Sequence, residues 1–459
     1  MEFYGSIHNH TDIGSNQRLR DSTNTIESLC WYAAEDLKHN FVAITDHESI
    51  SQSINAQKIE KKIREKYPDF KVIRGNEIYL CRDDLNKDTY QRGIDDFPHF
   101  ILLAKDAEGH KQLRELSTRA WVKNSFSTGK MLRVPTFYSD LKEIIGKNPG
   151  HVIFSTACLG SALAKKALIF SQTQNKDIYA QMKQWIAIIS NICGKENFFL
   201  EVQPSFNKEQ IAVNRVYKML AEEVNFPVVI SLDAHYLKKE DAPIHEAFLN
   251  AQEGEREVKS FYASTYMMSR EEIHEYMDES IGADTVSEWM NNTKLIYDMC
   301  EDYDLTRPLH IPYLPLTIDK ITDTDFEEFA GKIKELSYFY HSPHQPDRDM
   351  AAALVKKIQS NREEFDNERC FAEMDKNLEA IRVSSEKQNT QWSAYLLNMR
   401  DYIRVIWEKG NSLVGCSRGS GGGFLLLYML DIIQVNPLRE KAPLRYWRFL
   451  HSERASVLD

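Results

Sequence analysis

The chain has 459 residues, 42% hydrophobic and 27% charged, and its net charge of −11 is acidic for a nucleic-acid-binding protein, although bound cations can neutralise acidic clusters. Its longest apolar stretch, GFLLLYML, is far shorter than the roughly 20 residues of a membrane span, and the N-terminus lacks the basic and apolar segments of a secretory signal. Seven cysteines without a Cys-x-x-Cys pair argue against a disulfide framework and a zinc ribbon, and favour a reducing, cytoplasmic location.

The first motif along the chain is SIHNHTDIGS, which places His8 and His10 one residue apart. In an extended strand, side chains two positions apart point to the same face, so this spacing aims two imidazoles at one point. That arrangement suits a metal ion. Taken alone, the motif is equally consistent with the polar end of a surface strand.

Up to about residue 240, short apolar runs alternate with segments of helical periodicity such as 55–66 and 178–192. This alternation predicts an α/β protein with a largely parallel sheet or barrel. The runs expected to form buried strands are 41–47, 71–80, 99–105, 151–158, 197–203 and 226–235.

After about residue 260 the sequence becomes rich in charged, helix-favouring segments. A proline-bearing linker occupies 306–317, and a glycine-rich turn at 415–423 precedes an apolar helix. Of the roughly two to four domains that the length allows, we expect a second, mostly helical one to begin near residues 260–275.

Metal-ligand residue types recur at the ends of the expected strands. Residue 99 is the exception, because it begins its strand; antiparallel pairing of 71–80 with 99–105 would bring His99 close to Glu77. Since chemistry in α/β barrels collects at the carboxyl ends of the strands, these side chains can converge. They are His8, His10, Asp46, His47, Glu77, Cys158, Asp233 and His235.

Each of these residues has an ordinary structural explanation when taken singly, as a turn residue, a buried thiol or a core histidine. The cluster as a whole is better explained by a metal centre. Mixed imidazole, carboxylate and single thiolate ligands fit a multinuclear site of zinc, manganese or iron. Such a site predicts hydrolysis of a phosphate ester.

The motifs HNH, TDH, NE, the histidine before FILLAK, STACLG and DAH resemble, in this order, those of the PHP (polymerase and histidinol phosphatase) domain. HFILLAKDAEGHKQLRELST and FSTACLGS resemble more closely the PHP domain at the N-terminus of bacterial DNA polymerase III alpha subunits. The resemblance implies a PHP-type distorted (β/α) barrel over 1–270, two or three divalent metal ions and a 3′–5′ exonuclease in which His10 and Asp233 are catalytic. It implies nine metal ligands, Asp21 being supplied by the resemblance alone: His8, His10, Asp21, His47, Glu77, His99, Cys158, Asp233 and His235.

VGCSRGSGGGFLLLYMLDIIQVNPL, residues 414–438, resembles the palm motif of the same polymerases. A glycine turn alone is a weak signal, because its N–H groups can bind an anion or merely give flexibility. The resemblance implies an incomplete palm with a helical thumb over 271–459. It also implies that Mg²⁺ and an incoming dNTP bind there through Arg418, Gly419, Ser420, Arg448 and Arg454, with Asp459 as the first catalytic carboxylate.

The match departs from the family at its end. The family continues to a second aspartate two residues beyond Asp459, and Leu458 stands where it usually has proline. We therefore expect polymerisation on a DNA primer–template to need a further C-terminal part, supplied for example by a second polypeptide, through which a sliding clamp would bind. Two alternatives remain: a stand-alone phosphoesterase acting on a small phosphate ester, and a non-catalytic scaffold stabilised by metals.

Overall fold

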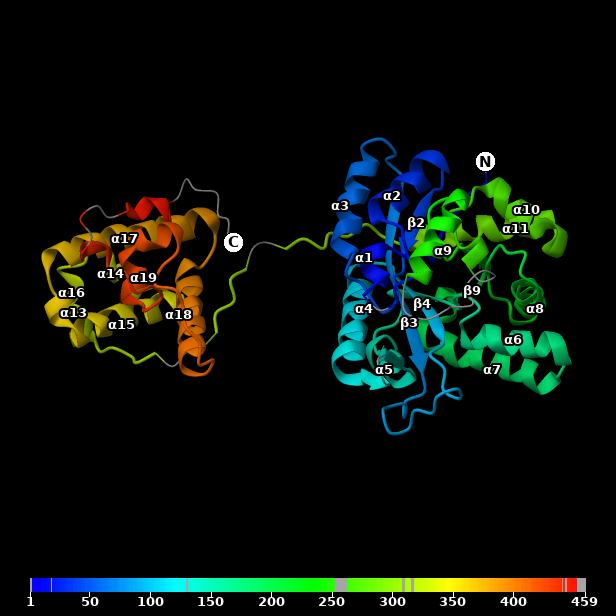
Figure 1. Cartoon of the computed structure of the whole chain (residues 1–459), viewed down its shortest axis with the longest axis horizontal. Coiled ribbons are helices and arrows are strands. Elements are labelled where there is room, and N and C mark those ends of the chain that lie inside the picture. Colours follow the sequence, from blue (N-terminus) through cyan, green and yellow to red (C-terminus); the bar gives the residue numbers. More distant parts are fainter. Residues whose placement is uncertain are drawn as a thin grey trace. The chain divides into compact units, whose positions relative to one another are not determined.

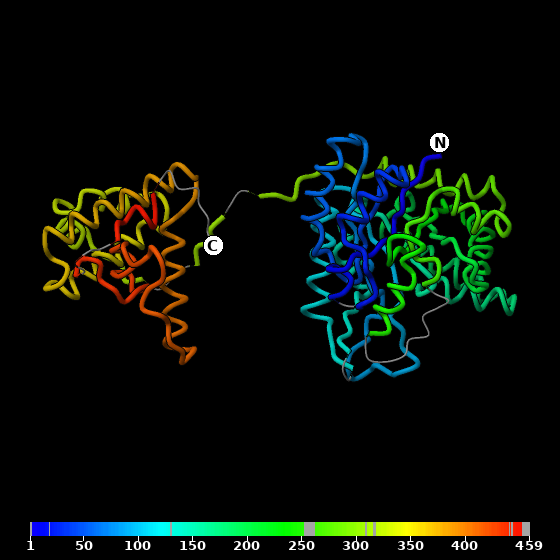
Figure 2. Tube along the Cα trace, turned by 45° about the horizontal axis from the view of Figure 1, so that its top comes forward, coloured from blue at the N-terminus to red at the C-terminus, as the bar shows by residue number. Residues whose placement is uncertain are grey.

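The computed structural model forms two compact units, Met1–Thr306 and Arg307–Asp459, coloured blue to green and yellow to red in Figures 1 and 2. No helix in the described part of the chain is both long and apolar enough to cross a membrane. The residues described are 2–17, 19–128, 131–251, 262–307, 310–314, 318–439, 441 and 444–451.

A single eight-stranded sheet forms the centre of the first unit. A parallel bridge between Asn9 and Ala234, in which the His10 N–H donates to the Ala234 carbonyl at 3.0 Å, joins the first strand to the last, so the sheet is nearly closed into a barrel. The order of neighbouring strands in this sheet is β1 (Gly5–Ser6), β2 (Phe41–Ile44), β3 (Lys71–Cys81), β4 (His99–Ala104), β8 (Val152–Ser155), β9 (Phe198–Val202) and β10 (Val228–Ile230). The eighth strand, β7 (Pro135–Phe137), pairs with β3 and lies off this path.

One strand of the barrel is reversed. Strand β4 runs antiparallel to both β3 and β8, whereas the other pairs on this path are parallel. In the β3–β4 register Tyr79 lies opposite His99 and Glu77 opposite Ile101. The antiparallel pairing expected from the sequence is therefore confirmed, and it returns His99 to the end of the barrel where Glu77 lies.

The strands bury side chains on both faces, because successive residues point to opposite sides of a sheet. Phe41, Ile73 and Ile101 belong to a cluster with Phe199 and Val229, while the intervening residues pack with the surrounding helices. Figure 1 shows α3 and α4 on one side of the strands and α6, α7 and α8 on the other. These helices are α3 (Ser53–Arg64), α4 (Ala107–Arg119), α6 (Ala162–Thr173), α7 (Lys176–Cys193) and α8 (Lys208–Val224).

Three further helices extend the first unit beyond the boundary at residue 270 that was expected from the sequence. Arg270, at the start of α10 (Arg270–Ile281), donates hydrogen bonds to the carbonyls of Glu2, Leu37 and Lys38. Helices α11 (Ala283–Asn291) and α12 (Thr293–Met299) contact β10 and β1. The compact unit ends at Thr306 because these helices pack on the barrel.

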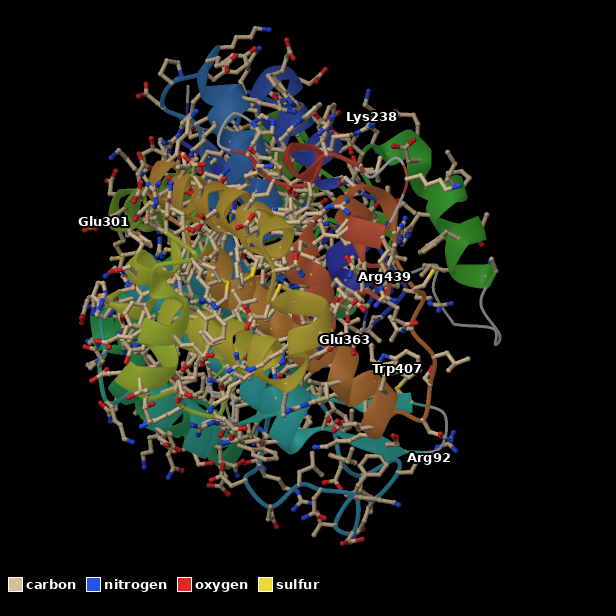
Figure 3. The ribbon with its side chains drawn as sticks, turned by 90° about the vertical axis from the view of Figure 1, so that its left-hand side faces the viewer. Arg92, Lys238, Glu301, Glu363, Trp407 and Arg439 are labelled. Carbon is tan, nitrogen blue, oxygen red and sulfur yellow. The ribbon has the colours of Figure 1, made fainter. Side chains whose placement is uncertain are left out.

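The second unit is helical in its described residues, as expected from the sequence. Phe329, Leu354, Leu378, Leu397 and Leu426 belong to its separate core. Trp407, near the end of α18, is one of the exposed side chains labelled in Figure 3. The main helices are α13 (Asp323–Ala330), α14 (Leu336–Tyr340), α15 (Gln345–Ser360), α17 (Glu368–Gln388), α18 (Trp392–Glu408) and α19 (Leu425–Met429).

Candidate metal centre

The two histidines of the opening motif lie side by side at the carboxyl end of the barrel. They follow β1 and flank Asn9, whose bridge to Ala234 keeps this segment extended. Their Nε2 atoms are 3.1 Å apart, and both side chains are fully buried. The spacing therefore directs both imidazoles to one point, as the sequence predicted.

Asp233 and His235 meet this pair from the other end of the chain, because they follow β10. Asp233 Oδ1 lies 3.2 Å from His8 Nε2 and 3.0 Å from His10 Nε2. The rings of His10 and His235 are 4.3 Å apart between centroids. The barrel closure thus joins two residue pairs separated by more than two hundred positions.

Glu77 occupies the centre of the cluster and is fully buried. Its Oε1 lies 2.8 Å from His99 Nδ1 and 3.3 Å from His8 Nε2, and its Oε2 lies 2.6 Å from His47 Nδ1. One carboxylate therefore contacts imidazoles from three different strand ends.

Asp21 and Cys158 complete the group. Asp21 Oδ2 lies 3.2 Å from His47 Nε2 and 3.8 Å from His235 Nε2, and Cys158 Sγ lies 3.4 Å from His99 Nδ1. The structure thus brings together all nine residues that the resemblance to PHP domains indicated, including Asp21.

Three residues with left-handed backbone conformations adjoin the cluster. Glu48, Ala157 and Asp233 have φ angles of +48°, +61° and +50°. Such conformations cost free energy in residues other than glycine and concentrate at functional sites. Here they occur next to His47, next to Cys158 and at Asp233 itself, so the backbone is bent where the cluster side chains enter.

Sequence reasoning missed the buried Glu201, which lies within β9. Its Oε1 accepts a hydrogen bond of 2.8 Å from His8 Nδ1, and it also accepts from Ser155 and Ser231. The signal was present, since Glu201 is a lone carboxylate inside the apolar run NFFLEVQ. Asp46, expected as a site residue, instead accepts hydrogen bonds from Thr11 and Ser15.

In three histidines of the cluster, the ring nitrogen Nδ1 makes a hydrogen bond that orients the ring. Nδ1 of His8 bonds to Glu201, that of His10 to Ser15 at 2.9 Å, and that of His235 to the Asp233 carbonyl at 2.7 Å. Such bonds set the tautomer and the ring orientation, as is usual for metal-binding imidazoles. Each Nε2 is thereby left to face the cluster.

The titratable side chains of the cluster shift one another's pKa values. Burial opposes the charged form of His8, but Asp233, Glu201 and Glu77 together raise its pKa well above the ordinary value. Burial and the neighbouring His47 lower the pKa of His10 well below it. Against the effect of burial, His47 and His235 lower the pKa of Asp21 to about 2. Ionised carboxylates are ligands that a divalent transition metal prefers, and a bound cation would take the place of the proton that the carboxylates favour on His8.

The buried polar atoms fit such ions. Within the described residues, both oxygens of Glu77 and both ring nitrogens of His47 have polar neighbours inside the cluster but no hydrogen bond of good geometry, and Asp21 Oδ1 makes no hydrogen bond, although unsatisfied buried polar atoms are costly. Ligand atoms within 4.8 Å of one another form three groups: His10–His47–His235, His8–His10–Asp233 and His47–Glu77–His99. The residues therefore suit two or three cations.

In the second unit, Gly419–Gly423 forms a short 3₁₀ turn, η6, after the exposed Arg418. Gly419 has a φ of +57°, and a Cβ on Gly423 would approach the Leu444 carbonyl oxygen to 2.6 Å, so both positions require glycine. Turn η8 (Tyr446–Arg448) contacts η6, which brings the segment of Arg448 next to that of Arg418 and Ser420. Arg454 and Asp459 lie outside the described residues.

Two domain families match the chain. The PHP domain matches residues 6–205, and the bacterial DNA polymerase III alpha NTPase domain matches residues 349–459. A metal-dependent phosphoesterase structure from Bifidobacterium adolescentis covers 50% of this chain and 87% of its own, at 15% identity and a TM-score of 0.30, a similarity too low to support an argument.

Curated relatives align along almost the whole chain. A DNA-directed DNA polymerase of Bacillus phage SPbeta is 37% identical over 98% of the chain, and the DNA polymerase III subunit alpha of Thermus aquaticus is 26% identical over 99%. The chain covers 36% and 38% of these two proteins, little more than a third of their length. Both matched domains and the colinear relatives agree with the order of the motifs: the chain carries a PHP domain and a match to the bacterial DNA polymerase III alpha NTPase domain, and along nearly its whole length it is similar to DNA polymerase III alpha subunits.

Proposed function

We propose that the barrel is a metal-dependent phosphodiesterase that removes nucleotides from the 3′ end of DNA, as part of a DNA-directed DNA polymerase. The observation that carries this proposal is the convergence of nine metal-ligand side chains, eight of them buried, at one end of the barrel. The names of the relatives support a DNA primer–template and dNTPs as the substrates of the whole protein.

The nine residues would hold two or three ions of zinc, manganese or iron, which when bound supply Lewis-acid activation of a phosphodiester and of water. Glu201 and Ser15 hold the rings of His8 and His10 in orientation from outside the cluster. His10 belongs to two of the three ligand groups, and Asp233 Oδ1 lies 3.0 Å from it. We therefore propose catalytic roles for His10 and Asp233.

The exposure of the cluster indicates the side from which substrate enters. The side chain of His99 is 22% exposed, whereas those of His8 and Glu77 are fully buried. A terminal phosphodiester would therefore reach the centre past His99, beside Cys158. Water on the other sides of the cluster is excluded by the protein, which strengthens the electrostatic interactions with a phosphate.

The glycine turn of the second unit is proposed as the site that binds the triphosphate of a dNTP with Mg²⁺. Arg418 and Arg448 would supply positive charge, and the N–H groups of Gly419 and Ser420 would donate to phosphate oxygens. Binding of the dNTP by Arg454 and catalysis by Asp459 stay predictions. The same holds for a second polypeptide that completes the polymerase and for a sliding clamp that binds through it.

The exonuclease is tested with a 3′-mismatched, 5′-labelled primer on a template in the presence of Mn²⁺. We expect wild type to shorten the primer, and His10→Ala and Asp233→Asn each to slow shortening at least about a hundredfold, because each variant loses a candidate metal ligand. His274→Gln is the matched control, since His274 lies in the same unit but outside the cluster, in contact with Asp278. Metal content per chain is measured in parallel.

Each other outcome supports a different function. An unchanged primer with two or three bound ions would indicate a metal-stabilised scaffold. Faster hydrolysis of a small phosphomonoester than of DNA ends would indicate a stand-alone phosphoesterase. Equal shortening by wild type and His10→Ala would show that the nuclease lies elsewhere.

A further inference from the structure

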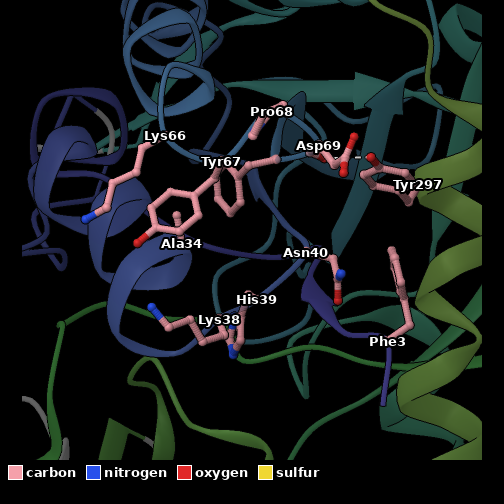
Figure 4. Close-up of a pocket in the computed structure, with 11 residues that line it drawn as sticks. Phe3, Ala34, Lys38, His39, Asn40, Lys66, Tyr67, Pro68, Asp69 and Tyr297 are labelled. Carbon is pink, nitrogen blue, oxygen red and sulfur yellow. Dashed lines mark hydrogen bonds between the residues drawn. The ribbon is translucent and has the colours of Figure 1, made fainter. Parts of the chain in front are cut away.

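A second concave site lies at the opposite end of the barrel from the metal centre (Figure 4). It has a volume of about 510 Å³, within the range of small-molecule sites. Phe3, Asn40 and Phe70 line it, and they directly precede β1, β2 and β3 or come within two residues of them. Since His10 and His47 follow the carboxyl ends of β1 and β2, the two sites are roughly 20 Å apart at about 3.3 Å per strand residue.

Aromatic rings form much of the cavity wall. Phe3, Tyr67 and Tyr297 are partly buried there, and the rings of Phe3 and Tyr297 meet edge to face at 5.3 Å between centroids. Figure 4 shows Tyr67 between the lysines on one side and Tyr297 on the other. Partly exposed aromatic rings in a cavity offer faces on which a planar heterocycle can stack.

One side of the cavity is cationic. The Nζ atoms of Lys38 and Lys66 lie 5.4 and 5.3 Å from the centroid of the Tyr67 ring. Glu35 contacts both lysines, through its carboxylate to Lys66 and through its backbone carbonyl to Lys38. One carboxylate between two ammonium groups leaves an excess of positive charge that suits an anionic group next to the aromatic wall.

Two polar side chains line the cavity between these parts. His39 is 4% exposed and its Nε2 donates to the Met268 carbonyl at 3.0 Å, which leaves Nδ1 as an acceptor without a hydrogen-bond partner among the described residues. Asn40 Oδ1 already accepts from the N–H of Tyr4, so what Asn40 can offer a ligand is its NH₂ group. Because His39 Nδ1 is itself buried, the NH₂ group of Asn40 is the group of this pair that can donate to the edge of a nucleobase.

We propose that this cavity binds a mononucleotide, with the base against the aromatic wall and the phosphate beside Lys38 and Lys66. The proposal goes beyond the exonuclease and does not depend on it. A nucleic-acid strand fits less well, because Lys38 and Lys66 are the cationic side chains among the described residues that line the cavity and Asp69 also lines it, so a run of phosphates would find no further positive charge there.

The test is calorimetric titration of the whole chain with AMP, adenosine, inorganic phosphate and a single-stranded oligoadenylate. We expect AMP to bind at least tenfold more tightly than adenosine or phosphate. Lys66→Gln should weaken AMP about tenfold and leave adenosine unchanged, because it removes one phosphate contact. Lys62→Gln, a 63% exposed lysine on the preceding helix, is the matched control and should change nothing.

Further variants separate this cavity from other sites. Tyr67→Leu should weaken the binding of AMP and of adenosine alike. Should Tyr67→Leu fail to fold, Lys38→Gln gives a second test of the phosphate contact. His10→Ala should leave AMP binding unchanged. Loss of binding in His10→Ala would place the nucleotide at the metal centre and overturn the proposal. Absence of AMP binding, equal affinity for phosphate, tighter binding of the oligonucleotide, or insensitivity to Lys66→Gln would overturn it too.

Discussion

At the scale of single residues, hydrogen bonds that fix the backbone decide where a side chain points and therefore what it can bind. Asn9 donates through its side chain to the carbonyls of Ser6 and Ala43, which locks the segment that carries His8 and His10. The two imidazoles were predictable because their spacing is local. The support from Glu201 to His8 was not, because it joins positions 193 residues apart.

The stability of the chain should depend on pH because of another buried histidine, His39. Burial and the nearby Arg270 lower its pKa to about 3, so the folded protein keeps the ring neutral while the unfolded chain protonates it near its ordinary value. Between about pH 6.5 and 3 the unfolded state therefore binds more protons, and the free energy of unfolding falls as the pH falls, by up to roughly 1.4 kcal/mol per pH unit for this group.

His39→Gln should flatten that dependence. Urea unfolding of wild type and variant at pH 7, 6 and 5, at the same metal content, measures the difference. The stability contributed by the neutral ring is fully present above pH 6.5, so the two slopes should separate only below it. Identical slopes between pH 6 and 5 would show that His39 titrates normally in the folded protein.

At the scale of elements, apolar runs located the long strands well. Strands β2, β3, β4, β8, β9 and β10 all lie within or within one residue of the runs expected from the sequence. The hairpin of β5 (Phe126–Thr128) and β6 (Met131–Arg133) was missed, because three partly exposed residues are too few to show a periodicity. The pattern of strands left closure into a barrel open, because a succession of strands does not state whether the first and last one meet, and the barrel was implied by the resemblance to the PHP domain.

Helix α10 belongs to the first compact unit, which ends at Thr306, whereas the sequence led us to expect a boundary after residue 270. Its charged composition suggested a solvent-exposed helical region, yet Arg270 is only 6% exposed and ties α10 to three carbonyls near the N-terminus of the chain. Hydrogen bonds made by a charged group contribute about 1.5–3 kcal/mol each at most, and a buried carbonyl without its donor adds a penalty.

Arg270→Ala should therefore lower the melting temperature of the first unit by several degrees, because it leaves three carbonyls without this donor. The change is followed by differential scanning calorimetry of the whole chain. The adjacent Glu271→Ala is the control, since Glu271 is exposed. Equal melting temperatures for Arg270→Ala and wild type would show that α10 is held by its apolar face alone.

At the scale of the whole molecule, the two units have separate cores, and the candidate metal ligands all belong to the first. Ions that bind only the folded state stabilise it by mass action. Chelation with EDTA should therefore lower one calorimetric transition by at least about 5 °C and leave the transition of the second unit unchanged.

His10→Ala assigns the transitions. In this variant EDTA should lower the melting temperature of the first unit less than in wild type, because a ligand shared by two of the three groups is already missing. A shift of both transitions on chelation would mean that the second unit also depends on bound metal. No shift of either would remove the structural argument for tightly held ions.

The bridge between Asn9 and Ala234 has a consequence for biosynthesis. During translation, His8 and His10 leave the ribosome early, but Asp233 and His235 emerge only after more than two hundred further residues have been added. Domains fold as units when their last strand is available. A nascent barrel therefore lacks two of its nine candidate ligands until these last residues are made, and the ligand set becomes complete only together with the barrel.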